Sequence, residues 1–376
     1  MQYRHFKKLN LDISLLGFGC MRFPTNEEGQ IDETQAQEMI DYAYEAGVNY
    51  FDTAWMYHGI GVSETFVGKA LAKYSRNSFY LADKFPIWEV KEESDIEKIF
   101  NTQLQRLNMN YIDFYLIHAL NKEYWEKVLK FNVLSYLEKW KAEGKIKHIG
   151  FSFHDDLDAF KTIVDGYDKW EFCQIQLNYM DTTHQQGMQG YEILAQKEIP
   201  CLIMEPLKGG ALSNLPDAVK LPLTKLEKET SSSAWALRYV ANLENVHIIL
   251  SGMSHLDHVK DNIKTISEFK PLAAHELEAI ENVKAMIENR VKVACTGCNY
   301  CMPCPVGVNI PQNFKVLNNY TMYENIGATK WGFGELVKKN TDASVCVECG
   351  ACETHCPQQL SIIEDLKLVN KCLTAL

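Results

Sequence analysis

The 376-residue sequence has no long apolar run, no cluster of basic residues and no apolar stretch behind its first eight residues. A membrane-spanning helix needs about 20 consecutive apolar residues, which this chain does not offer. A net charge of −11 without a basic run argues against nucleic acid or an anionic membrane as a partner. The opening residues lack the apolar core of a secretory signal. We therefore expect a cytoplasmic protein.

Cysteine is almost missing from the first 290 residues, where only Cys20, Cys173 and Cys201 occur. Eight of the 12 cysteines instead lie between Cys295 and Cys356. Uneven use of this kind in a cytosolic chain indicates metal binding rather than disulfides. The three early cysteines and Cys372 are typical of buried structural thiols.

Apolar strands and helical segments alternate with regularity up to about residue 270. The strands are predicted at 14–21, 50–54, 79–85, 112–118, 148–152, 172–178, 200–206 and 246–251. Eight strand–helix units in roughly 250 residues favour a (β/α)8 TIM barrel, the α/β class in which all strands end at one mouth. An open doubly wound sheet is the alternative, but no G-x-G-x-x-G follows the first strand. We expect a barrel over residues 1–275 and a small, mainly helical domain over 276–376.

Three predicted strands end on ionisable residues, which are costly to bury unless they have partners. They are Asp52, Lys84 and His118, and Tyr57 follows Asp52 by five residues. A lysine ammonium lowers the pKa of a nearby phenol, and a carboxylate keeps that lysine charged. Such a tyrosine can protonate a carbonyl oxygen while a hydride arrives at the carbon. Each residue alone is more typical of an ordinary salt bridge, but the four together predict a catalytic site.

These residues resemble the aldo-keto reductases, in order and over nearly all of residues 1–270. The matching segments are Gly17-Phe18-Gly19-Cys20-Met21, Phe51-Asp52-Thr53-Ala54 with Tyr57, Lys84, His118, Gly150-Phe151-Ser152, Gln174 and Pro206-Leu207 with Gly209-Gly210. The resemblance implies that Tyr57 is the proton donor, that Lys84 and Asp52 tune it and that His118 orients the carbonyl. It implies a nicotinamide coenzyme held by Gly19, Met21, Ser152, Gln174, Met204, Pro206, Leu207, Gly209, Gly210, Ser251, Gly252, Met253, His258, Asp261 and Asn262.

Three features depart from the family pattern. Phe153 follows Ser152 where asparagine is common, and Met204 stands where an aromatic ring often stacks on the nicotinamide. The segment after the last strand, 251–255, lacks the Lys or Arg that usually clamps a 2′-phosphate. His258 is a weak substitute because Asp257 and Asp261 flank it. The resemblance therefore favours NAD(H) over NADP(H).

The eight clustered cysteines form two runs of four. The first is Cys295, Cys298, Cys301 and Cys304, and the second is Cys346, Cys349, Cys352 and Cys356; each fourth cysteine precedes a proline. Paired C-x2-C motifs also bind zinc. The triple spacing with Cys-Pro is more specific for [4Fe-4S] clusters, and eight thiolates suffice for two.

The region resembles two-cluster bacterial-type ferredoxin modules and the helical ferredoxin domains of multi-subunit oxidoreductases. That resemblance implies one ligand set of Cys295, Cys298, Cys301 and Cys356 and another of Cys304, Cys346, Cys349 and Cys352.

Three functional interpretations follow. The leading one is a reductase for a small-molecule carbonyl whose clusters exchange electrons with a ferredoxin-like partner. A flavin would then link the two-electron hydride to one-electron transfer, although the sequence carries no flavin motif. In the second interpretation the clusters are structural, and in the third the chain is a regulatory subunit that senses nucleotides.

The sequence also predicts an apolar substrate pocket and a lid. The pocket residues are Trp55, Met56, Phe85, Trp88 and Leu120. Loop 211–230 is predicted to form the lid over the coenzyme.

Overall fold

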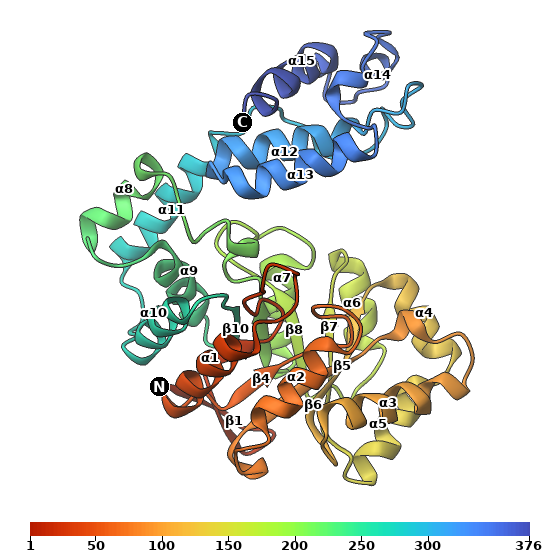
Figure 1. The fold of residues 1–376 in the computed structure, drawn as a ribbon, viewed down its shortest axis with the longest axis vertical. Coiled ribbons are helices and arrows are strands. Elements are labelled where there is room, and N and C mark those ends of the chain that lie inside the picture. The colour runs from red at the N-terminus through yellow and green to blue at the C-terminus, as the bar shows by residue number, and fades with distance from the viewer. The chain divides into compact units, whose positions relative to one another are not determined.

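The computed structural model describes residues 1–376, which divide into two compact units (Figure 1). Unit 1 comprises Met1–Gly209 and Ser233–Ala273, and unit 2 comprises Gly210–Ser232 and Ala274–Leu376. Each unit has its own buried core. No helix is long and apolar enough to cross a membrane.

Unit 1 is built on a closed barrel of eight parallel strands, which confirms the predicted fold. The barrel order is β10-β3-β4-β5-β6-β7-β8-β9, so each strand pairs with its neighbour in sequence and β10 closes against β3. The strands are β3 (Leu16–Gly19), β4 (Tyr50–Asp52), β5 (Tyr80–Phe85), β6 (Ile112–Leu120), β7 (Ile146–Phe153), β8 (Phe172–Gln176), β9 (Cys201–Met204) and β10 (Val246–Gly252).

An antiparallel hairpin of β1 (Tyr3–Phe6) and β2 (Leu11–Ser14) closes the amino-terminal end of the barrel. Phe6 and Ile13 of this hairpin pack with Tyr50, Phe114 and Phe172, which lie at or near the beginnings of β4, β6 and β8. All five side chains are fully buried. The hairpin therefore plugs one end, and the opposite end, where the strands finish, is the mouth.

Helices cover the outside of the barrel, and the larger apolar core lies between them and the strands. They are α1 (Glu33–Glu45), α2 (Val62–Leu71), α3 (Ser94–Leu107), α4 (Lys122–Lys130), α5 (Val133–Ala142), α6 (Leu157–Asp165), α7 (Gly187–Gln196), α9 (Ser232–Ala241) and α10 (Leu256–Ser267). The sequence pattern predicts one helix over 124–143, which is wrong. Asn132 has a φ of 52°, a left-handed conformation that ends α4 and starts α5.

Unit 2 contains helices and no strand. They are α8 (Asp217–Leu226), α11 (Ala274–Glu288), α12 (Ile310–Tyr323), α13 (Ile326–Lys338), α14 (Ala351–Thr354) and α15 (Ile362–Leu373). Segment 211–230, expected to be a loop, thus contains α8, with Pro222 inside it. Helices α12, α13 and α15 share a small core that includes Phe314, Leu317, Leu336 and Leu366. The cysteine runs lie in the irregular segments before α12 and around α14.

Helices α2 and α3 approach closely at Gly68. A Cβ built there would lie 2.3 Å from the carbonyl oxygen of Leu107 at the end of α3, so only glycine allows this contact. We expect Gly68→Ala to lower the free energy of unfolding by about 1–3 kcal/mol, because the helices must separate. Thermal unfolding measures this change. Gly334→Ala in α13, where a Cβ meets nothing within 4 Å, is the control and should not lower the unfolding temperature; equal effects of the two variants would contradict this account.

Candidate functional site

The strand ends bring the four predicted catalytic side chains together at the mouth. Asp52 ends β4, Lys84 and His118 lie near the ends of β5 and β6, and Tyr57 follows in the β4–α2 loop. Lys84 is fully buried, and its Nζ donates to Asp52 Oδ1 at 2.6 Å and to the Thr53 carbonyl oxygen at 2.8 Å. The same Nζ lies 5.1 Å from the centroid of the Tyr57 ring. The Tyr57 and His118 rings meet edge to face with 6.2 Å between centroids.

Burial controls the protonation states of this group. Burial opposes the charge on Lys84, but the nearby Asp52 and Tyr57 outweigh it and raise the pKa of Lys84. For Asp52 burial is the larger influence, and the pKa of its carboxyl is raised despite the ammonium beside it. Lys84 therefore keeps its proton at neutral pH.

Lys84 lowers the pKa of Tyr57, as expected. Burial is the larger effect, however, and raises the net pKa of Tyr57 above its ordinary value. Burial, with the charges of Lys84 and His154, also lowers the pKa of His118 well below the usual value. The mouth therefore holds a protonated phenol beside a neutral imidazole. Nδ1 of His118 is buried without a hydrogen-bond partner.

The predicted apolar pocket is correct for only part of its residues. The Trp88 ring lies 5.0 Å from the His118 ring, so Trp88 forms a wall of the mouth. Phe85 and Leu120 are fully buried in the core between barrel and helices. Strand alternation explains Phe85, because Lys84 points into the mouth and its neighbour must point outward.

Two predicted coenzyme contacts lie on neighbouring strands. Ser152 of β7 pairs in register with Gln174 of β8. The Ser152 hydroxyl oxygen accepts a hydrogen bond from the Ala119 backbone N–H at 2.7 Å, so its own hydrogen is directed elsewhere. Gln174 Nε2 lies 3.5 Å from the Met204 sulfur, and Gln174 Oε1 is buried without a partner. The two side chains thus offer one unused donor and one unused acceptor.

The end of β10 holds a second group of predicted coenzyme contacts. Ser251 Oγ accepts from Asn262 Nδ2 at 2.9 Å, and both side chains are buried. Met253 is also buried. The pKa of His258 is lowered by burial and by His255, so it carries little positive charge at neutral pH. Asp261 of α10 has an interaction partner of its own.

Loops around the mouth contain the remaining predicted contacts. Gly19 packs against the Ser251 backbone, where a Cβ would lie 3.1 Å from the carbonyl oxygen, and Met21 is about half exposed. Pro206, Leu207 and Gly209 follow β9, and Gly209 and Gly210 have φ values of 63° and 92°.

Arg22 is a mouth residue that the sequence reasoning missed. It follows β3, yet its Cγ would lie 2.6 Å from a Cβ at Gly252, the last residue of β10. The pairing of β10 with β3 closes the barrel and brings these distant segments together. The only signal in the sequence is the position of Arg22 directly after the first barrel strand. The side chain of Arg22 therefore begins beside the end of β10, where the local segment 251–255 contains no Lys or Arg.

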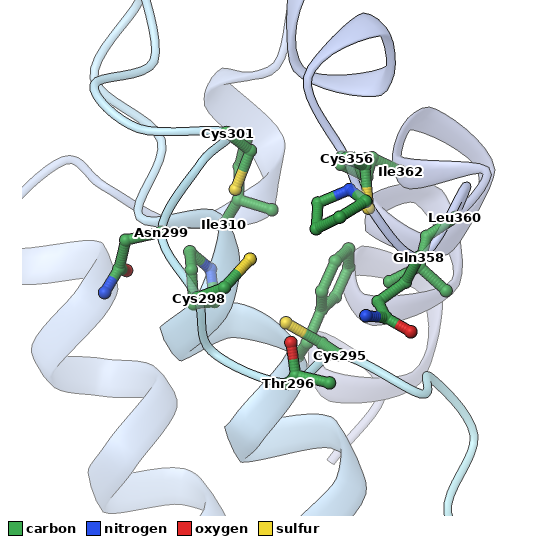
Figure 2. A pocket seen from close by; sticks show the side chains of 13 residues that line it. Cys295, Thr296, Cys298, Asn299, Cys301, Ile310, Cys356, Gln358, Leu360 and Ile362 are labelled. Carbon is green, nitrogen blue, oxygen red and sulfur yellow. The ribbon is translucent and has the colours of Figure 1, made fainter.

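Each cysteine group of unit 2 lines its own cavity and draws on both runs. Cys295, Cys298, Cys301 and Cys356 line the first cavity, and Figure 2 shows their sulfur atoms directed toward a common space. Cys304, Cys346, Cys349 and Cys352 line the second. Ile310, the first residue of α12, lines both cavities. The pKa of Cys352 is raised to about 11 by burial and by nearby groups that include Cys346 of its own cavity and Cys301 of the other.

A closed parallel barrel with titratable side chains at the carboxyl ends of its strands defines a (β/α)8-barrel enzyme. A family model described as the aldo/keto reductase family matches residues 15–285. The chain belongs to this family and is an oxidoreductase. A second model, described as a 4Fe-4S dicluster domain, matches residues 294–360.

Two curated proteins and one solved structure illustrate the similarity to known proteins. "Probable aldo-keto reductase 1" of Glycine max is 34% identical over 149 residues, which cover 38% of this chain and 42% of that protein. L-galactose dehydrogenase of Arabidopsis thaliana is 24% identical over 314 residues, 77% of this chain and 95% of that protein. The holo form of aldo-keto reductase AKR11C1 from Bacillus halodurans has a TM-score of 0.62 at 27% identity, covering 75% and 96% of the two chains.

Because the Lys84–Asp52 pair is buried, we expect the loss in free energy of unfolding on breaking it to depend on pH. Lys84→Met should lower the free energy of unfolding by about 3–5 kcal/mol near neutral pH, because Asp52 is left buried without its cation. Removing the ammonium raises the folded-state pKa of Asp52 further above its unfolded value. The folded state then binds a proton more tightly, so the deficit should shrink as pH falls and grow as pH rises.

Thermal unfolding of wild type and variant at pH 5.5 and pH 8 measures this dependence. Lys69→Met, which removes an exposed pair with Glu33, is the control and should change stability little at either pH. A Lys84→Met deficit that is the same at both pH values would contradict the account.

Proposed function

We propose that the barrel reduces an aldehyde or ketone to an alcohol with a nicotinamide coenzyme, and that Tyr57 is the proton donor. The observation that carries this proposal is the placement of the Tyr57 phenol between a buried ammonium and a neutral imidazole. Because burial keeps the phenol protonated, it has a proton to give at neutral pH. In this proposal residues 1–275 form the reductase domain and residues 276–376 a separate domain of a cytoplasmic protein.

The roles of the four side chains follow from their protonation states. When bound, a nicotinamide coenzyme supplies a hydride to the carbonyl carbon. Neutral His118 donates a hydrogen bond to the carbonyl oxygen and so orients it. Tyr57 transfers its hydroxyl proton to the same oxygen, and the Lys84 ammonium stabilises the phenolate that remains. Asp52 holds Lys84 charged and directed toward Tyr57.

The nicotinamide carboxamide fits the unused groups at the mouth. An amide has N–H donors and a carbonyl acceptor, which complement the buried Gln174 Oε1 and the hydroxyl hydrogen of Ser152. We propose Met204 as the side chain against which the ring rests, in place of an aromatic residue. The orphaned acceptor on Gln174 supports this assignment, since a buried polar atom is costly until it is paired.

The rest of the coenzyme is assigned to the loops after β9 and β10. We propose that Gly19, Met21, Pro206, Leu207, Gly209, Gly210, Gly252 and Met253 approach it through their backbone, and that Ser251, His258, Asp261 and Asn262 lie on the adenosine side. We propose that Arg22, whose Cγ lies beside Gly252, offers its positive charge to a phosphate of the coenzyme. The coenzyme is NAD(H) or NADP(H), and preference for NAD(H) stays a prediction. Calorimetric titration with both decides it.

We further propose that the eight cysteines of unit 2 ligate two [4Fe-4S] clusters, three from one run and the fourth from the other. Such clusters, when bound, transfer one electron at a time. Two cavities that each gather four thiols, with Ile310 between them, fit this donor set. The match to a 4Fe-4S dicluster domain supports clusters over the tetrahedral zinc that paired C-x2-C motifs also bind. A ferredoxin-like protein is the proposed electron partner, with a flavin as the link to hydride chemistry.

A purely structural role of the clusters is the second candidate. Several cysteines pack against the small core of unit 2, so their ligation would stabilise a domain with little apolar material of its own. Anaerobic spectra with NADH separate the two roles, since electron transfer bleaches the clusters and a structural role leaves them unchanged. The complete tetrad argues against a nucleotide-sensing subunit without catalysis.

Tyr57→Phe tests the proton donor. We expect kcat for aldehyde reduction to fall by about 10²–10⁴-fold, because the acid is lost, while the coenzyme Kd changes little. Stopped-flow turnover and coenzyme titration measure the two effects separately. Tyr111→Phe, at the opposite end of the barrel, is the control. Loss of coenzyme binding with intact turnover of bound coenzyme would be evidence against this role.

Cys352→Ala tests the cluster assignment. We expect the anaerobically purified variant to lose about half of its iron and inorganic sulfide, because one ligand set is incomplete and the other is complete. Cys372→Ala is a matched control, because Cys372 lies in the same unit but lines neither cavity. Unchanged iron in Cys352→Ala, or an equal loss in both variants, would refute the two-set assignment.

A further inference from the structure

A buried polar group lies behind β5, on the side facing α2 and α3. It consists of Glu64 of α2, Asp83 of β5, and Gln103 and Arg106 of α3; the first three are fully buried. Gln103 is the centre, because its Nε2 lies 2.9 Å from Glu64 Oε1, 2.8 Å from Asp83 Oδ2 and 3.0 Å from the Lys84 carbonyl oxygen. The close approach of α2 and α3 at Gly68 brings the two helices within reach of one another.

The orientation of the Gln103 amide follows from its neighbours. Its Oε1 accepts from the Tyr115 hydroxyl at 2.5 Å, and the reversed amide would set an oxygen against three oxygens. The amide nitrogen has only two hydrogens for three acceptors, so one further proton is needed among them. The buried carboxyl groups of Glu64 and Asp83 have one cationic side chain bonded within the group, Arg106, because Lys84 Nζ is bonded to Asp52.

Asp83 is the group that holds the extra proton. Burial, reinforced by the charge of Glu64 and only partly opposed by Lys84, raises the pKa of Asp83 well above its ordinary value. Glu64 has Arg106 as its partner, with Nη1 at 2.8 Å from Oε2. Asp83 therefore acts as a neutral acid beside Glu64, which is paired with Arg106.

One arm of this group fixes the main chain of Lys84. The Lys84 backbone N–H donates to Asp83 Oδ1 at 2.8 Å, and its carbonyl oxygen accepts from Gln103. Side chains of this group thus hydrogen-bond both the N–H and the carbonyl oxygen of Lys84. The Lys84 side chain consequently extends from a fixed backbone toward Asp52 and Tyr57.

The other arm fixes the loop that carries Tyr57. The Arg106 guanidinium lies 4.0 Å from the centroid of the Trp55 ring, and its Nε would be 2.6 Å from a Cβ at Gly61. The Gly61 backbone N–H donates to the Trp55 carbonyl oxygen at 2.8 Å and closes the loop. Arg106 therefore contacts both ends of the loop in which Tyr57 lies.

We propose that Glu64, Asp83, Gln103 and Arg106 act as positioning residues that set the separation of Tyr57 and Lys84. None of the four touches the reacting atoms. They join the backbone of the lysine to the loop of the tyrosine through one hydrogen-bonded unit. The effect of this positioning on catalysis rests on the proposed function, because the distance between Lys84 and Tyr57 matters for turnover only if Tyr57 donates the proton.

Arg106→Lys tests the proposal, because it keeps the charge beside Glu64 but loses the planar contact with Trp55 and Gly61. We expect kcat for aldehyde reduction to fall about tenfold with little change in coenzyme Kd, since small displacements of catalytic groups are costly. The alkaline limb of the kcat/KM profile should move to higher pH, because a more distant Lys84 lowers the pKa of Tyr57 less.

Arg76→Lys is a matched control at the other end of the barrel. Arg76 pairs with the buried Asp113 and lies 3.9 Å from the Tyr111 ring, and its side chain is as exposed as that of Arg106, 23% against 22%. We expect it to lower stability without moving kcat or the pH profile. Tyr115→Phe, which frees the Gln103 amide, should shift the profile in the same direction as Arg106→Lys.

Crystal structures of both arginine variants provide a readout that is independent of turnover. The distance from Lys84 Nζ to the Tyr57 ring centroid, 5.1 Å here, should lengthen in Arg106→Lys alone. Equal kinetics in the two arginine variants, or an unchanged distance in Arg106→Lys, would overturn the proposal. A wild-type protein that reduces no carbonyl overturns the proposed function instead, and the distance comparison then still decides the positioning role.

Discussion

A lysine ammonium buried at the mouth of the barrel is the constraint on which the site depends. Lys84 has no exposed surface, and it stays charged because Asp52 and a backbone carbonyl oxygen accept its hydrogen bonds. Its positive charge lowers the pKa of His118 and partly offsets the effect of burial on Tyr57. Burial of Tyr57 and His118 themselves is the larger influence on both pKa values, and it leaves a phenol that can donate a proton and a neutral imidazole that can hydrogen-bond.

Unit 2 differs from the barrel because the clustered cysteine side chains lie against its apolar core. Its core is small, and cysteine side chains from both runs pack against it. Each cavity is lined by cysteines from both runs. Ile310 lines both cavities. In the proposed arrangement, cysteines that ligate the clusters also pack against the core of this unit.

The elements most clearly predicted from the sequence were those with strong periodicity. Apolar strands ending on Asp52, Lys84 and His118 were sufficient to place these side chains at one mouth, because parallel strands of a barrel all finish on the same side. The prediction was wrong where side-chain direction or local backbone mattered. Phe85 points outward, and residues 124–143 form two helices because Asn132 adopts a left-handed conformation. Alternation along β5 accounts for Phe85 once Lys84 is placed in the mouth, whereas the left-handed conformation of Asn132 has no distinct signature in the order of residue types.

The sequence by itself determined the fold class, the family and the residue types available for chemistry, since these depend on periodicity and on motifs along the chain. Only the tertiary structure decided what surrounds each residue. The raised pKa of Tyr57, the position of Arg22 beside Gly252 and the contacts of Gln103 with Asp83 all arise between segments far apart in sequence. Burial and hydrogen bonding are properties of packed neighbours, and a chain acquires those neighbours only when it closes into a barrel.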